Sequence, residues 1–159
     1  MSRNITVEEK FGTKLTLLQD ILDKKQAALV AVLNISENME TLHLSPPSDE
    51  RQKFLIEMGK EKQKQIDYVL ACDEAFQSIF DGIADEFEEK SAEHAEKIGQ
   101  LQFSINEVLE LDTKIRAQEE KNELIANANF GQQDAEGGIN PTNASYIQSK
   151  QRAANKGAH

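Results

Sequence analysis

The chain has 159 residues, a formal net charge of −10 at pH 7 and one cysteine, and 38% of its residues are hydrophobic. The acidic excess disfavours binding to nucleic acids or to anionic membranes, and no apolar run approaches the roughly 20 residues that stable membrane insertion requires. A single cysteine excludes an internal disulfide and is typical of a reducing compartment, so we expect a cytoplasmic protein.

The first predicted helix covers residues 7–44. Thr6 and Glu9 have the spacing of an N-terminal capping box, and apolar residues then recur at intervals of three and four. The resulting apolar stripe is too wide for a two-stranded coiled coil. Its central residues are Phe11, Leu15, Leu18, Leu22, Leu29, Val32 and Met39.

Two further helices are predicted at about residues 49–88 and 92–128. Pro46 and Pro47 end the first helix, and Ser48 is placed to cap the second. The polar stretch from Glu88 to Glu93 favours a turn, although one continuous helix over 49–127 stays open because no glycine or proline lies in that stretch. The three segments have similar lengths, which favours folding back over oligomerisation of one long helix.

The fold class is therefore all-α: an elongated antiparallel three-helix bundle or coiled coil over residues 1–129, with a C-terminal tail over 130–159. The tail is rich in glycine and alanine, and its charge of +1 contrasts with −11 for the body. Tyr146 and Ile147 form its one aromatic and β-branched pair, so we expect them to dock on the body or on another chain.

No pattern of catalytic residues, metal ligands or cofactor-binding residues is evident, and we expect a protein that is not an enzyme. His43, His94 and His159 lie far apart, and none belongs to a Glu-x-x-His pair. One alternative is similar to histidine phosphotransfer domains, in which a lysine follows the histidine by three residues, as Lys97 follows His94. Ile98 departs from that pattern, because those domains have a small residue there.

The second and third segments resemble the flagellar FlgN-type export chaperones. The likeness covers residues 10–127 and rests on a Lys/Gln-rich opening at residues 62–66 followed by Leu70, Asp73 and Phe76, and on the series Leu101, Ile105, Val108, Leu111, Ile115, Glu119 and Asn122. The resemblance implies a chaperone that shields the terminal helices of hook–filament junction proteins and delivers them to the type III export apparatus. It also implies that Tyr146 acts at the export gate.

We expect the partner-binding face on the C-terminal half of the third helix, because a mixed apolar and polar face suits reversible binding of a helix. The alternative is a structural or regulatory bundle that acts as an adaptor, and self-association stays open. The expected binding residues are Leu111, Asp112, Ile115, Glu119, Asn122, Leu124 and Ile125.

Overall fold

The computed structural model describes residues 7–133, and no strand occurs among them. Three long helices, α1 (Val7–Leu44), α2 (Asp49–Asp81) and α4 (Ala95–Gln133), are joined by short segments that include a 3₁₀ turn, η1 (Ala84–Glu86), and a single helical turn, α3 (Phe87–Lys90). The predicted all-α class is confirmed for this part of the chain. Helix α4 continues to Gln133 and so extends into the range 130–159 that was expected to form the tail, and residues 134–159 lie outside the described residues.

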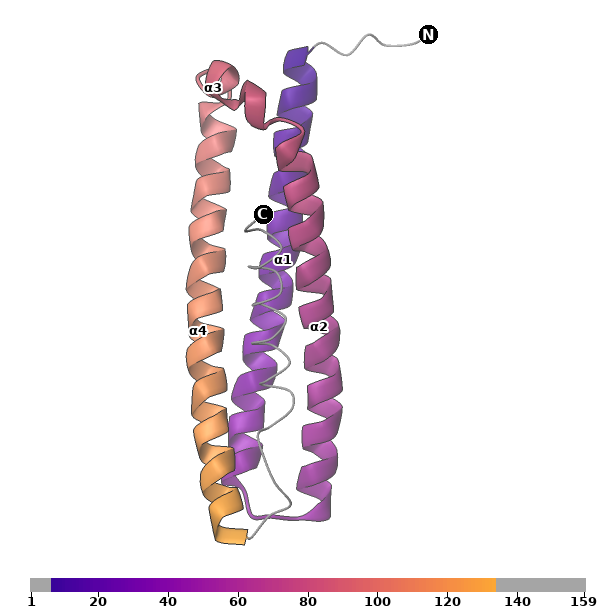
Figure 1. The fold of residues 1–159 in the computed structure, drawn as a ribbon, viewed down its shortest axis with the longest axis vertical. Helices are drawn as coiled ribbons and strands as arrows, with labels where there is room; N and C mark the ends of the chain where they lie inside the picture. Colours follow the sequence, from indigo (N-terminus) through magenta and orange to yellow (C-terminus); the bar gives the residue numbers. More distant parts are fainter. Residues whose placement is uncertain (1–6, 134–159) are drawn as a thin grey trace.

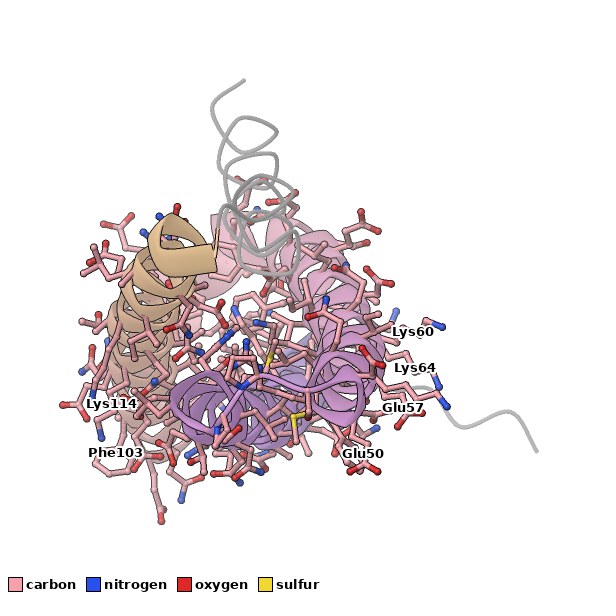
Figure 2. The ribbon with its side chains drawn as sticks, turned by 90° about the horizontal axis from the view of Figure 1, so that it is seen from below. Glu50, Glu57, Lys60, Lys64, Phe103 and Lys114 are labelled. Carbon is pink, nitrogen blue, oxygen red and sulfur yellow. The ribbon has the colours of Figure 1, made fainter. Side chains whose placement is uncertain are left out.

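The long helices run side by side, with α1 and α4 pointing one way and α2 the other (Figure 1). Seen along the bundle, α1 lies between α2 and α4 (Figure 2). The backbone of α1 approaches both neighbours closely, whereas the backbones of α2 and α4 approach each other little. This arrangement explains the wide apolar stripe of α1, which has to cover two helices at once.

Polar side chains link α1 to α4 along much of their length. Gln19 donates to Ser104 at 2.8 Å, Gln26 donates to Glu107 at 2.9 Å, and Asn129 donates to the backbone carbonyl of His43 at 2.7 Å. The partners stay 81 to 86 residues apart in sequence, which is the signature of two parallel helices in a fixed register. The α1–α2 contact carries an ion pair between Lys25 and Asp73.

The turn between α1 and α2 follows the sequence prediction. Ser48 has an extended backbone, and its hydroxyl accepts a hydrogen bond from the Arg51 amide at 3.0 Å. Asp49 and Glu50 in the first turn complement the positive end of the helix dipole. The Arg51 guanidinium donates to the Ser45 carbonyl at 2.8 Å, which holds the loop against α2.

The second turn differs from the prediction, because α2 ends at Asp81 rather than near residue 88. The amides of Gly82 and Ile83 bond to carbonyls three residues back, at 3.1 and 3.0 Å, so the last turn tightens into 3₁₀ geometry. Ile83 is thereby buried over the end of the core. The break falls next to Gly82, a residue of low helix propensity, and it lets the Ile83 side chain cover the end of the core.

Aromatic residues close this turn end. Phe11 meets Phe87 edge to face with ring centroids 5.8 Å apart, and Phe87 meets Phe80 at the same distance. Phe76 stacks on Phe80, and His94 packs on Phe11 at 5.1 Å. We call these five residues the aromatic cluster.

Candidate functional site

A group of polar side chains lies buried in the other half of the bundle, where all three long helices contribute. Lys62 of α2 and Glu119 of α4 are both 0% exposed, and the ammonium donates to the two carboxylate oxygens at 2.7 and 2.9 Å. The Ser36 hydroxyl of α1 donates to the same carboxylate at 2.6 Å. Asn122 donates to the Ser36 carbonyl at 2.8 Å and accepts from Gln118 at 3.0 Å. We call Ser36, Lys62, Glu119 and Asn122 the polar cluster.

The polar cluster is costly to bury and is therefore closely paired. Removing an ammonium and a carboxylate from water opposes folding by several kcal/mol for each ion, about as much as their attraction returns. Burial accordingly lowers the pKa of the Lys62 ammonium, and the contact with Glu119 opposes this shift. The three hydrogen bonds that the Glu119 carboxylate accepts are what make its burial tolerable.

His43 lies beyond the polar cluster, near the end of α1, and is also buried. Its pKa is lowered from the usual 6.5, first by burial and then by the positive charges of Arg51 and Lys62. The imidazole is therefore neutral at pH 7.

The structure separates the seven predicted partner-binding residues. Ile115, Glu119 and Asn122 are fully buried, so a partner reaches them only if a helix moves aside. The half-buried residues are Leu111, Asp112 and Ile125. Leu124 alone is open, at 71% exposure, and it lies two residues from Asn122 and hence on the opposite side of α4. The seven residues therefore do not form one surface in the folded bundle. Their alternation of apolar and polar side chains lies largely on the interior side of α4.

The sequence analysis assigned Glu119 and Asn122 to a partner-binding face of α4, whereas the structure buries both, and it did not predict their partners Lys62 and Ser36. A signal was present for Lys62, since it precedes Ile66 and Val69 by four and seven residues and so shares their buried face.

Two acidic residues named in the sequence analysis, Asp73 and Asp112, pair with cations outside the polar cluster. Asp73 of α2 pairs with Lys25 of α1, and Asp112 pairs with Arg116 on the same helix at 3.2 Å. These two carboxylates therefore lie at the margins of the helix contacts and not in the interior.

His94 lies at the turn end and is half-buried against Phe11. It approaches α1 where Gly12 has no side chain: a Cβ there would stand 3.2 Å from the imidazole Cε1. Its Nε2 atom is buried and has no hydrogen-bond partner within the described range. A phosphotransfer histidine has to present a ring nitrogen to a donor protein, and this packing disfavours that alternative.

The flanks of α2 and α4 that face away from α1 leave apolar side chains incompletely covered. Ser104 and Glu107 mark the side of α4 that bonds α1, and Ile105 and Leu109 lie on the other flank at this helix periodicity. Leu109 is 58% exposed, Ile105 is exposed and Leu70 of α2 is half-buried on the core. We call Leu70, Ile105 and Leu109 the α2–α4 edge.

Membrane-spanning and metal-binding features are both absent from the part of the chain that the structure describes. None of the helices over residues 7–133 is both long and apolar enough to cross a bilayer. In the same range, no three histidine, cysteine, aspartate or glutamate side chains are grouped so as to hold a metal ion. The tail residues Tyr146 and Ile147 lie outside the described range, as does the predicted cap Thr6.

Comparisons with protein-family models, with curated proteins and with solved structures found no match.

Proposed function

We propose that this chain is a cytoplasmic export chaperone that binds the terminal amphipathic helices of flagellar hook–filament junction proteins and shields them before type III secretion. The observation that carries the proposal is the α2–α4 edge. It is a strip of incompletely covered apolar side chains on the flanks of α2 and α4, whose backbones approach α1 closely but each other little.

A client helix laid along this edge would complete a four-helix packing. Its apolar face would cover Leu70, Ile105 and Leu109, and each buried CH₂ group would contribute about 0.8 kcal/mol. The ion pair of Asp112 and Arg116, one turn further along α4, would supply a polar border. Such a border keeps an interface reversible, as a chaperone requires, because it tolerates water when the client leaves.

This proposal moves the expected binding face from the interior of α4 to its free flank. The resemblance of residues 10–127 to FlgN-type chaperones supports the class of client, and the acidic body suits a soluble carrier that does not adhere to membranes or nucleic acids.

The test uses the full chain and a synthetic peptide of a junction protein's terminal helix, with affinity measured by isothermal titration calorimetry. Leu109→Glu is expected to weaken binding at least tenfold, because it places a charge in an apolar contact. Leu124→Glu is the matched control: it makes the same change at an exposed leucine of the same helix, and its affinity should stay within about twofold of the wild type. Equal affinities for all three proteins, or no binding by the wild type, would refute the proposal.

A further inference from the structure

The seam between α1 and α4 has a second surface feature, on the outside of the bundle and away from the α2–α4 edge. An open hollow of about 580 Å³ lies over the N-terminal halves of both helices. It is lined by Gln19, Asp23, Glu96, Gly99, Phe103 and Ser104, together with Gln100.

Phe103 is the apolar anchor of this hollow. It is 65% exposed and points outward from α4 (Figure 2), whereas the four phenylalanines of the aromatic cluster pack against the core. Gly99 lies one turn earlier on the same helix, and apart from its chain neighbours and the adjoining backbone of α4, no atom of the described residues lies within 4 Å of the position where its Cβ would be. The space beside the ring is therefore open to a side chain from another molecule.

Hydrogen bonds hold the side chains in the wall of the hollow in place. Gln19 donates to Asp23 at 3.0 Å and to Ser104 at 2.8 Å, so its carboxamide is fixed from both helices. A fixed wall lowers the entropy lost on binding. The Oε1 atom of Gln19 is buried and has no hydrogen-bond partner within residues 7–133.

The rim of the hollow carries two carboxylates, Asp23 and Glu96, and no basic side chain is among the described residues that line it. A second copy of this chain, with its own charge of −10, would bring acid against acid. A segment rich in lysine or arginine would be attracted instead.

We propose that the hollow binds a basic amphipathic helix of another polypeptide, with one apolar side chain seated beside Phe103 and lysine or arginine side chains near Asp23 and Glu96. This surface is separate from the α2–α4 edge, so it would let the chain hold a second partner while a client is bound.

The probes are two synthetic amphipathic helical peptides with the same leucine face, whose polar positions are all lysine in one and all glutamate in the other. Calorimetry with the full chain should show binding of the lysine peptide alone. Phe103→Ala should weaken this binding at least tenfold, and Leu124→Ala should leave it within twofold of the wild type. Both substituted side chains are exposed, and circular dichroism of each variant checks that the helices are intact.

Two further variants test whether the peptide binds in this hollow. Glu96→Gln should weaken binding of the lysine peptide several-fold, whereas Glu57→Gln, which makes the same charge change on the outer face of α2, should not. Equal effects of these two changes would mean attraction to the net charge only and would overturn the proposal. Loss of binding in Leu109→Ala but not in Phe103→Ala would place the peptide on the α2–α4 edge and would likewise overturn it, while leaving the proposed function standing.

Discussion

At the turn end of the bundle, Phe11 packs on Phe87 and His94 through ring contacts alone, whereas in the other half Lys62 and Glu119 meet through hydrogen bonds of 2.7 and 2.9 Å. The aromatic cluster joins α1 and α2 to α3 and to the turn before α4, whereas the polar cluster joins α1, α2 and α4. Ring contacts depend mainly on buried area and have only a modest preference for edge-to-face or offset geometry, while a buried ion pair requires two charged groups to meet at one position. The aromatic cluster therefore supplies stability, and the polar cluster selects the alignment of the helices.

The alignment matters most for α2 and α4, because their backbones approach each other little. The Lys62–Glu119 pair connects these two helices directly, and Ser36 ties the same carboxylate to α1. A shift of α4 by one turn would separate the charges inside the core. This is how one buried pair can exclude the other registers that heptad sequences allow.

Breaking the buried pair should lower the stability most. Lys62→Met leaves the Glu119 carboxylate buried without its cation, and we expect a loss of about 3–5 kcal/mol in the free energy of unfolding by urea titration. The double variant Lys62→Met/Glu119→Leu is the control, since it removes both charges. Its stability should return close to that of the wild type or exceed it. If the double variant were as unstable as Lys62→Met, the loss of stability would not come from the unpaired Glu119 carboxylate, and this account of the ion pair would be wrong.

A substitution in the aromatic cluster should lower the free energy of unfolding by a smaller amount. Phe11→Leu keeps a large apolar side chain in the core and loses mainly the ring contacts with Phe87 and His94, so we expect a loss below about 1.5 kcal/mol in the same titration. A loss comparable to that of Lys62→Met would contradict the claim that the aromatic cluster tolerates substitution better than the polar cluster does.

The weakest effect concerns His43, next to the polar cluster. Its pKa in the folded protein is lowered from 6.5. As the pH falls below 6.5, the unfolded chain takes up a proton that the folded imidazole does not, so the free energy of unfolding should decrease until the folded pKa is reached. Urea titrations at several pH values should show this slope in the wild type and a flatter one in His43→Gln. An unchanged slope in the variant would assign the pH dependence to other groups.

The long helices could be predicted from the sequence because their signals are local. The range of α1, from Val7 to Leu44, follows from an unbroken apolar period and the two prolines after it, and the start of α2 follows from the Ser48 cap. The end of α2 was predicted seven residues too late. Ile83 and Phe87 keep the apolar spacing of a helix, and only the three-dimensional core shows that the chain bends there to bury Ile83.

The candidate binding residues were harder to predict for a related reason. A heptad pattern tells which residues of α4 share a face, but it does not tell whether that face meets a partner or another part of the same chain. Both Ile115 and Glu119 proved to be interior: Ile115 belongs to the hydrophobic core, and Glu119 bonds Ser36 of α1 and Lys62 of α2. The pairing of Glu119 with a lysine 57 residues away depends on the antiparallel register of α2 and α4, which no local signal fixes.

Binding of a client helix at the α2–α4 edge can be observed by methyl NMR of the full chain during titration with a junction-protein terminal helix. We predict that the methyl signals of Leu70, Ile105 and Leu109 shift together, while those of Leu124 and the buried Ile115 stay in place. Shifts confined to Leu124, or a collapse of the Ile115 signal as α4 leaves the bundle, would contradict binding at the α2–α4 edge.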